Sequence, residues 1–260
     1  MPILQKIVIS NFRNIEFQEL EFSPKINCIW GNNGEGKTNL LDAVYYLSMT
    51  KSALGISDSF NCRHGQDGFS IAGTCLMPSA LTSRFSIVVK KGEEKKLRCD
   101  DKPYGRISEH IGKLPTVIIS PSDISLVSDS GEERRRFMNA VVSQIDREYL
   151  SAIQQYNRLL AQRNRMLKDG VCDATLLDVI DIKMSSHADF IHRKRAELCE
   201  PLTEAVNEYY RRLSGGSESV SIRYRSDLDK APLEQLLKDS LEKDRIMKYT
   251  TVGIQRDVFI

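Results

Sequence analysis

The stretch Gly31-Asn32-Asn33-Gly34-Glu35-Gly36-Lys37-Thr38, GNNGEGKT, decides the fold of this chain. It fits the pattern G-x-x-x-x-G-K-[ST] at every fixed position. The apolar run INCIW (26–30) precedes it, and TNLLDAVYYL (38–47), with apolar residues at helical spacing, follows it. A strand, a glycine-rich loop and a helix in this order predict a phosphate-binding P-loop.

The residue types of this stretch suit phosphate chemistry. Glycines let main-chain amides fold around anionic oxygens without a Cβ in the way. The helix N-terminus adds a partial positive charge, and Lys37 places a full charge on the β- and γ-phosphates. The Thr38 hydroxyl can ligate Mg²⁺. The sequence therefore predicts a nucleotide site for ATP, with Mg²⁺ held at Thr38.

Hydrolysis needs more than this loop, usually an acidic residue at the end of a second buried strand. The apolar run PTVIIS (115–120) is followed by Pro121-Ser122-Asp123, which has the wrong pattern. TLLDVIDI (175–182) lies in a helical pattern. Because we find no Walker B sequence and assign no catalytic residue, we expect this chain to bind ATP without hydrolysing it.

Composition bounds the class of protein. The chain has 260 residues, of which 41% are hydrophobic, enough for one large domain or two smaller ones. It shows no secretory signal and no apolar run of the ~20 residues that a membrane span needs. Its six scattered cysteines have no metal-ligand spacing with histidine, which indicates a reducing compartment. We expect a cytoplasmic protein, and the net charge of +2 permits only a local basic face.

The first part of the chain predicts an α/β fold, with a mixed sheet around the P-loop helix. Leu40, Leu41, Val44 and Leu47 are expected on the buried face of that helix. Residues 55–68 are expected to form a loop. The expected strands are 4–12, 16–22, 26–30, 69–77, 84–91, 95–101 and 115–120.

From about Ser128 the hydrophobic period becomes helical. A serine and early glutamates open a helix at 130–145, and Asp169-Gly170 ends the next one. A further run extends to Leu213, and Pro201 is expected to kink or restart it. The two long helices predict an antiparallel arm inserted in the ATPase head. The residues that recur at spacings of three and four are Tyr149, Ile153, Tyr156, Leu160, Arg163 and Leu167, then Leu177, Ile180, Met184, His187, Ile191, Leu198, Leu202, Tyr209 and Leu213.

Three domains are therefore expected. Residues 1–127 form an ATPase lobe with the P-loop, 128–215 a helical insertion, and 216–260 an incomplete return segment toward the ATPase head. In the last part, SVSIRYRS (219–226) alternates like a strand, and LEQLLKDSLEKDRIM (233–247) predicts one amphipathic helix.

Several stretches resemble a known family. ISNFRNIE (9–16), the P-loop region and TKSALGISD (50–58) are similar to the RecF, SMC and Rad50 group of ABC-type ATPases. Residues 114–146, YLSAIQQYNRLLAQRNRMLK (149–168) and YTTVGIQRD (249–257) resemble the RecF family in particular. The similarity runs through almost the whole chain.

The resemblance implies an ATP-dependent DNA-binding protein of recombinational repair, the SOS response and replication-fork maintenance. Members dimerise around ATP, bind junctions of single- and double-stranded DNA, and work with recombination mediator proteins. The segment 120–123 stands where relatives have a glutamine-bearing loop, and it has no glutamine. The implied nucleotide-binding residues are Arg13, Gly31, Asn32, Asn33, Gly34, Glu35, Gly36, Lys37, Thr38 and Asn39.

The chain departs from the family pattern after residue 257. Members continue into a signature helix, a Walker B strand and a final histidine, whereas this chain ends at Ile260. We interpret it as truncated, a nucleotide-binding fragment without catalysis, in which dimerisation is doubtful. Leu213-Ser214-Gly215-Gly216-Ser217 matches the ABC signature in four letters. Because it closes a helix instead of opening one, we predict a turn with Gly215 or Gly216 at the C-cap.

The first half of the arm is the candidate DNA surface. Between Arg134 and Lys168 the sequence has eight lysines or arginines against two acids, Asp146 and Glu148. The alternatives are a solvated helix surface, or pairing of residues 134–136 with acids of the sheet domain. The predicted DNA-contacting residues are Arg134, Arg135, Arg136, Arg158, Arg163, Arg165 and Lys168.

Two other functions compete with this interpretation. A DNA-bridging ATPase of the Rad50 or SMC type needs hundreds of heptad residues, whereas a helix of this length reaches only ~40–60 Å. A P-loop kinase acting on a small molecule would need a substrate lid and an acid close to the P-loop. The long helical insertion and the strand carrying NFRN (11–14) argue against the kinase.

Overall fold

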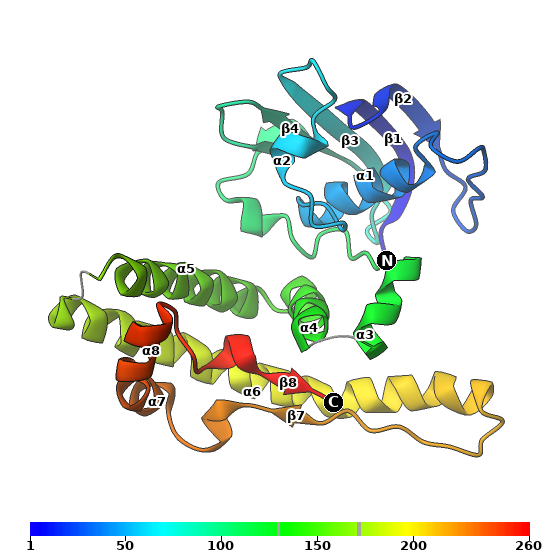
Figure 1. Ribbon diagram of the computed structural model, residues 1–260. Helices are drawn as coiled ribbons and strands as arrows, with labels where there is room; N and C mark the ends of the chain where they lie inside the picture. Colours follow the sequence, from blue (N-terminus) through cyan, green and yellow to red (C-terminus); the bar gives the residue numbers. More distant parts are fainter. Residues whose placement is uncertain (129–130, 171–172) are drawn as a thin grey trace. The chain divides into compact units, whose positions relative to one another are not determined.

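The computed structural model describes residues 1–128, 131–170 and 173–260 (Figure 1). The chain forms two compact units, Met1–Ser120 and Pro121–Ile260. The division falls earlier than the predicted boundary at residue 127. Residues 216–260 belong to the helical unit, which differs from the predicted return toward the ATPase lobe. The serine expected to open the helix at 131–145, Ser130, lies outside the described residues.

The first unit is built on a six-stranded sheet in the order β2-β1-β3-β4-β5-β6. All of its described pairings are antiparallel, so these residues supply only the antiparallel part of the predicted mixed sheet. The predicted strands at 4–12, 16–22, 69–77, 84–91 and 95–101 are confirmed. The strands are β1 (Ile3–Phe12), β2 (Ile15–Glu21), β3 (Gly68–Leu76), β4 (Thr82–Lys90), β5 (Lys96–Cys99) and β6 (Lys102–Pro103).

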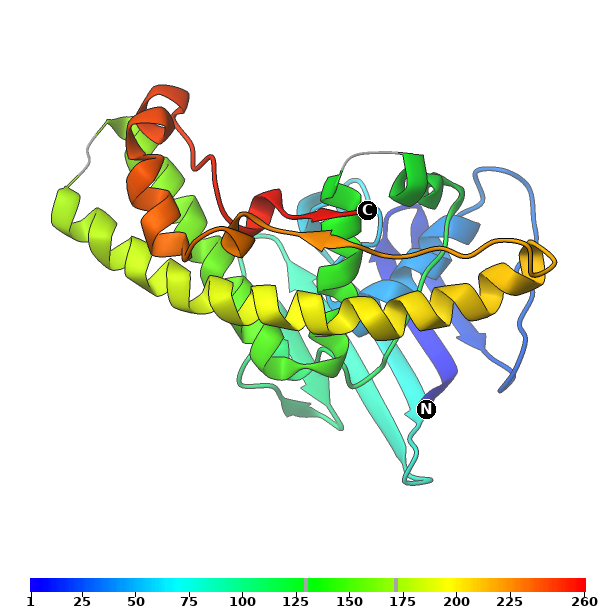
Figure 2. The ribbon, with the colours of Figure 1, turned by 90° about the horizontal axis from the view of Figure 1, so that it is seen from below.

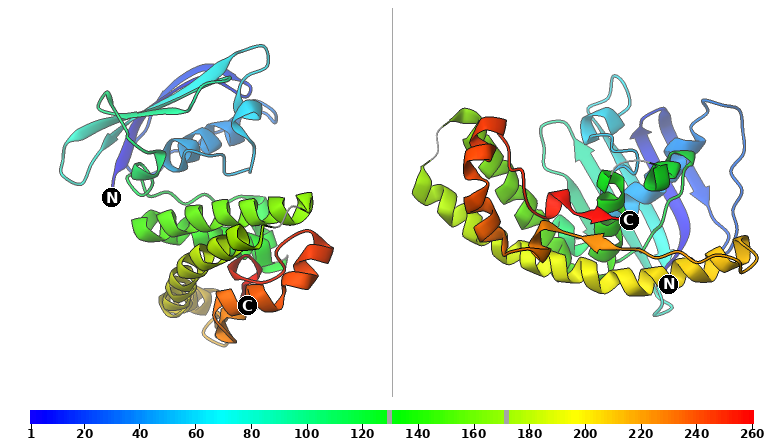
Figure 3. Two further views of the ribbon diagram at one scale, coloured as in Figure 1. Left: turned by 90° about the vertical axis from the view of Figure 1, so that its left-hand side faces the viewer. Right: turned by 60° about the horizontal axis from the view of Figure 1, so that its bottom comes forward.

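Helix α1 (Lys37–Met49) covers one face of this sheet (Figure 3). Strand β3 alternates buried and half-buried residues along its whole length, which gives the sheet one apolar face. A Cβ on Gly73 would lie 2.3 Å from Leu47 Cδ2, so this glycine lets the helix approach closely. Leu40 and Leu47 are buried as predicted, but Leu41 is 47% exposed and its predicted burial is wrong. The short helices are α2 (Asp58–Asn61) and η1 (Ile107–Glu109).

Two predicted strands, 26–30 and 115–120, are wrong. Within the described residues neither segment pairs with another strand. A strand needs a neighbour for its main-chain donors and acceptors, and apolar side chains alone do not provide one. Trp30 is 91% exposed and Ile119 is 84% exposed, so both runs are apolar but unburied.

The second unit is helical. It contains α4 (Gly131–Ile145), α5 (Arg147–Asp169) and α6 (Ala174–Leu213), after η2 (Pro121–Ile124) and α3 (Ser125–Ser128). Asp146 caps α5 by accepting from the Tyr149 N–H at 3.0 Å, and Gly170 ends it with φ 70°. Helices α5 and α6 pack side by side (Figure 2). Contacts of Arg163 with Asp181 and of Tyr149 with Arg195 show that they are antiparallel, as predicted.

The predicted helical period describes the core of this unit well. Tyr149, Ile153 and Tyr156 of α5 are buried against Ile180 and Met184 of α6. Helix α6 runs unbroken through Pro201, so the predicted restart is wrong. The periodic run ends at Leu213 as α6 does, and at this end Tyr209 is 65% exposed and Leu213 is 84% exposed.

The last segment packs with the helices. The predicted strand at 219–226 shrinks to β7 (Tyr224–Arg225), which pairs with β8 (Val258–Phe259). The single helix predicted at 233–247 is two, α7 (Leu233–Asp239) and α8 (Leu241–Met247), because Ser240 ends one and begins the other. Two 3-10 helices, η3 (Asp227–Asp229) and η4 (Ile254–Arg256), complete it.

The end of α6 shows that Leu213–Ser217, which resemble the ABC signature, form a turn and not the start of a helix. Gly215 and Gly216 have φ of 64° and 83°, and the Gly216 N–H donates to the Arg211 carbonyl at 2.9 Å. This is a glycine helix end of the Schellman type, which confirms the predicted turn.

No helix of the described chain is long and apolar enough to cross a membrane. Its described cysteines are free thiols.

Candidate nucleotide-binding site

The glycines of the P-loop adopt the conformation that the motif requires. Gly34 and Gly36 have φ of 87° and 101°, a region that L side chains rarely adopt. Gly36 is the N-cap of α1, and no side chain caps the first turn of that helix. Main-chain N–H groups at the start of α1 are therefore available to an anion. A cradle of this kind fits the phosphates of a nucleotide.

Lys37 lies across the loop at the start of α1. Its ammonium donates to the Gly31 carbonyl at 2.8 Å and to the Asn32 carbonyl at 2.6 Å. These two bonds hold the charge against the main chain of the loop, at the residue where α1 begins. Thr38 beside it is exposed, so its hydroxyl could serve a cation that takes its other ligands from phosphates and water.

Glu35 bonds within the loop. Its carboxylate accepts from the main-chain N–H of Asn32 at 2.8 Å and from the Asn32 side-chain amide at 2.9 Å. These hydrogen bonds from Asn32 lower the pKa of Glu35, and Lys37 adds to the effect. The carboxylate therefore stays ionised and closes the turn from Asn32 to Glu35.

Arg13 lies beside α1, in the turn between β1 and β2. Its guanidinium donates to Asn39 Oδ1 at 2.9 Å and to Asn61 Oδ1 at 3.0 Å, and it forms an ion pair with Asp42. Asp42 is fully buried and also accepts from Ser52. Burial lowers the pKa of Arg13, and Asp42 opposes that shift.

The structure thus gathers the predicted residues of the first unit around one loop. Arg13 lies within hydrogen-bond distance of Asn39, the residue that follows Gly31–Thr38 in the sequence. That Arg13, Asn39 and the residues of the loop contact a nucleotide stays a prediction. Sequence reasoning missed Asn14 and Asp42, which hold this arrangement through hydrogen bonds. Asn14 directly follows Arg13 in NFRN, and that position was the available signal. In the described residues no cluster of three or more histidine, cysteine, aspartate or glutamate side chains could hold a metal.

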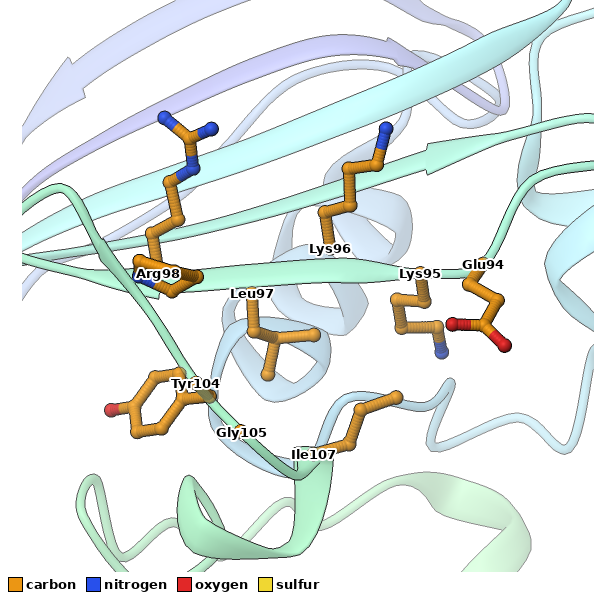
Figure 4. A pocket seen from close by; sticks show the side chains of 9 residues that line it. Glu94, Lys95, Lys96, Leu97, Arg98, Tyr104, Gly105 and Ile107 are labelled. Atoms are coloured by element: carbon orange, nitrogen blue, oxygen red, sulfur yellow. The ribbon is translucent and has the colours of Figure 1, made fainter.

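A separate cavity of about 680 Å³ lies between β5 and the segment after β6 (Figure 4). Lys96 and Arg98 point to one side of β5, and Leu97 and Lys95 to the other. Lys95 is committed to the fold, because it donates to the Thr50 carbonyl at 2.6 Å and pairs with Asp58 at 2.8 Å. No residue of Gly31–Thr38 lines this cavity, and we assign it no ligand.

The predicted DNA-contacting residues of the second unit divide into two groups. Arg163 is 0% exposed and pairs with Asp181 at 2.8 Å and Asp244 at 2.7 Å. It holds helices together, so its prediction as a DNA contact is corrected. Arg134 donates to the Phe259 carbonyl and Arg135 to the Asp257 carbonyl, both at 2.7 Å. These two arginines bond main-chain carbonyls of their own unit.

The other predicted cations are exposed. Arg158 and Lys168 lie on the solvent side of α5. Arg165 is 85% exposed and lies 3.7 Å from Asp169. Arg136 of α4 is 58% exposed, with Glu133 at 3.1 Å. A basic stripe remains on α5, formed by Arg158, Arg165 and Lys168.

Sheet, P-loop and P-loop helix together define the class: this is an ABC-type P-loop ATPase head with helices added to it. A family model described as an AAA domain matches residues 6–247. The chain is 42% identical over 256 residues to the DNA replication and repair protein RecF of Porphyromonas gingivalis, covering 98% of this chain and 70% of that protein. It is 40% identical over 255 residues to RecF of Parabacteroides distasonis, with the same coverage.

Solved structures agree with these relatives. The recombination mediator protein RecF with ATP, from the RecFOR pathway, superimposes with a TM-score of 0.91 at 29% identity, covering 99% of this chain and 72% of that one. The chain belongs to the RecF family. Both the predicted family and the predicted ATPase class are confirmed.

Proposed function

We propose that this chain binds ATP at Gly31–Thr38 and acts in recombinational DNA repair. The observation that carries the proposal is the cradle itself, with left-handed glycines, the Lys37 ammonium and the uncapped N-terminus of α1 at one point. The similarity to a RecF structure with ATP supports it. In this account Lys37 binds the terminal phosphates, and Thr38 holds Mg²⁺ between protein and nucleotide.

We also propose that the chain binds DNA through the basic stripe on α5. Binding to DNA phosphates needs exposed cations, and Arg158, Arg165 and Lys168 meet this requirement where Arg163 does not. We propose that such binding occurs at junctions of single- and double-stranded DNA, as the resemblance to the family implies. Homodimerisation around ATP, recombination mediator partners, the SOS response and a cytoplasmic location are part of the same proposal.

A DNA-bridging role of the Rad50 or SMC type is less well supported. Helix α6 has 40 residues and therefore spans about 60 Å, too little for a long tether. Hydrolysis by this chain is a different question, and the expectation that it binds ATP without turnover stays a prediction.

Calorimetric titration with ATP and Mg²⁺ tests the proposed site. We expect saturable binding by the wild-type chain and none by Lys37→Ala at the same concentrations, because the phosphates lose their cation. Lys102→Ala is the matched control, since Lys102 is an exposed lysine of β6 away from the loop. Equal binding by Lys37→Ala would remove the cradle from the nucleotide site.

A further inference from the structure

Asn14 contacts both sides of the P-loop with one side chain. Its Nδ2 donates to the Gly34 carbonyl at 3.1 Å, and its Oδ1 accepts from Asn39 Nδ2 at 2.7 Å. Gly34 lies in the loop and Asn39 in the first turn of α1. A single amide on the turn between β1 and β2 therefore ties the loop to the helix that follows it.

The same side chain lies against Gly36. A Cβ built on Gly36 would lie 2.7 Å from Asn14 Oδ1 and 3.0 Å from Nδ2. The amide plane is thus in direct contact with the main chain at the point where the loop becomes α1. Together with the two hydrogen bonds, this contact restrains the loop from Gly34 to Lys37.

Asn14 is one step in a directed chain of hydrogen bonds. Arg13 Nη1 donates to Asn39 Oδ1, Asn39 Nδ2 donates to Asn14 Oδ1, and Asn14 Nδ2 donates to the Gly34 carbonyl. Each amide accepts from one neighbour and donates to the next, and hydrogen bonds in such chains strengthen one another.

The chain of hydrogen bonds begins at a rigid point. Arg13 pairs with Asp42, which is fully buried and also accepts from the Ala53 N–H at 2.7 Å. The Gly34 end lies at the surface. The hydrogen bonds therefore connect the ion pair between Arg13 and buried Asp42 to the exposed loop at Gly34.

We propose that Asn14 is a positioning residue of the proposed ATP site, on which this inference rests. It holds the main chain from Gly34 to Lys37 in the conformation that receives the phosphates, without contacting them. An amide is required, because aspartate could not donate to the Gly34 carbonyl and alanine would make neither bond.

The test compares Asn14→Ala with Asn11→Gly. Asn11 lies just before the same turn, and its Nδ2 makes one long hydrogen bond, of 3.4 Å, to Gln66 Oε1. Its φ of 54° suits glycine, so this control removes an amide without strain. ATP with Mg²⁺ and inorganic tripolyphosphate are titrated into each variant by calorimetry, and thermal melting checks the fold. Tripolyphosphate probes the cradle alone.

We expect Asn14→Ala to weaken both ligands by about tenfold, the loss typical of hydrogen bonds of ordinary strength, and Asn11→Gly to leave both unchanged. Asn39→Ala with Asn14→Ala should cost less than the sum of the two single changes, because both break the same chain of hydrogen bonds. If Asn14→Ala does not fold, Asn14→Asp, which keeps the bond from Asn39, replaces it and should also weaken both ligands.

Two results would overturn the inference. One is unchanged tripolyphosphate affinity in Asn14→Ala, whether or not its melting temperature falls. The other is strict additivity of the Asn14 and Asn39 changes. If the wild-type chain binds neither ligand, the proposed ATP site itself fails, and that outcome is distinct from the other two.

Discussion

Two arginines that pair with buried aspartates, the half-buried Arg13 of the first unit and the buried Arg163 of the second, have different roles. Each pairs with a buried aspartate: Arg13 with Asp42, Arg163 with Asp181 and Asp244. The bonds of Arg163 stay within its own unit and join α5 to Asp181 of α6, Asp244 of α8 and Thr250 just after α8. Those of Arg13 continue through Asn39 toward an exposed loop. Pairing with a buried aspartate therefore does not define the role of an arginine; the residues that its other hydrogen bonds reach do.

Arg195 of α6 repeats the pattern of Arg163. It is 1% exposed, pairs with Asp257 at 2.5 Å and donates to the Tyr149 hydroxyl at 3.2 Å. Nearby, the Tyr156 hydroxyl donates to Gln255 Oε1 at 2.5 Å. The stretch YTTVGIQRD, which carried much of the family resemblance, thus supplies buried partners for the helices. Its contribution in this unit is to stability.

The largest effect that separates the two arginine networks is expected from Arg163→Ala. It leaves Asp181 and Asp244 buried without their cation, so the free energy of unfolding should fall by about 3–5 kcal/mol. Urea unfolding measures this, and Arg165→Ala, at an 85% exposed position, should change it by less than about 0.5 kcal/mol. Similar small losses in both variants would show that the ion pairs of Arg163 do not hold the unit together.

A second experiment tests whether the exposed basic stripe on α5 binds DNA, which the buried Arg163 cannot do. Arg158→Glu with Arg165→Glu should weaken DNA binding at least several-fold and flatten its dependence on salt, by about one unit of slope for each DNA phosphate that is no longer neutralised. Fluorescence anisotropy over a range of salt concentrations measures both. Lys243→Glu, an exposed change on α8, is the control. The stripe is excluded as a DNA site if the double variant, like the Lys243→Glu control, keeps the affinity and the salt slope of the wild-type chain.

The smallest effect concerns the helix cap beside these networks. Asp146 accepts from the Tyr149 N–H, and this bond, with Lys194 nearby, lowers the pKa of Asp146. Asp146→Ala should cost about 1 kcal/mol of unfolding free energy at neutral pH. A lowered pKa gives stability above the unfolded value, about 3.9, and loses it as the pH falls through the folded value. The difference between wild type and variant should therefore shrink below about pH 4, and a constant difference would argue against the charge.

The sequence predicted those parts of the fold whose signals are local. Alternation found β1, β3 and β4, and the helical period found the core of α5 and α6. Residues 26–30 and 115–120 misled because strand formation depends on a partner that an apolar run does not reveal. The helix restart predicted at Pro201 was wrong, because α6 continues through this residue, which lies at an exposed position of the helix.

The candidate site shows the same division. The P-loop was found because its glycines, lysine and threonine have fixed spacing. Asn14 and Asp42 were missed, because their hydrogen bonds join segments that are distant in the sequence. These segments are the turn between β1 and β2, the P-loop with α1, and the residues just after α1. Arg163 was assigned to DNA from charge, although it recurs at helical spacing with Tyr156 and Leu160. A position at that spacing faces the neighbouring helix, and Arg163 is 0% exposed.

Hydrogen exchange of main-chain amides tests the central claim most directly. We expect ATP with Mg²⁺ to slow exchange in residues 31–40 of the wild-type chain, because the phosphates accept from those N–H groups, and to leave Lys37→Ala unchanged. Nucleotide binding with no protection of residues 31–40, or equal protection in Lys37→Ala, would contradict the account.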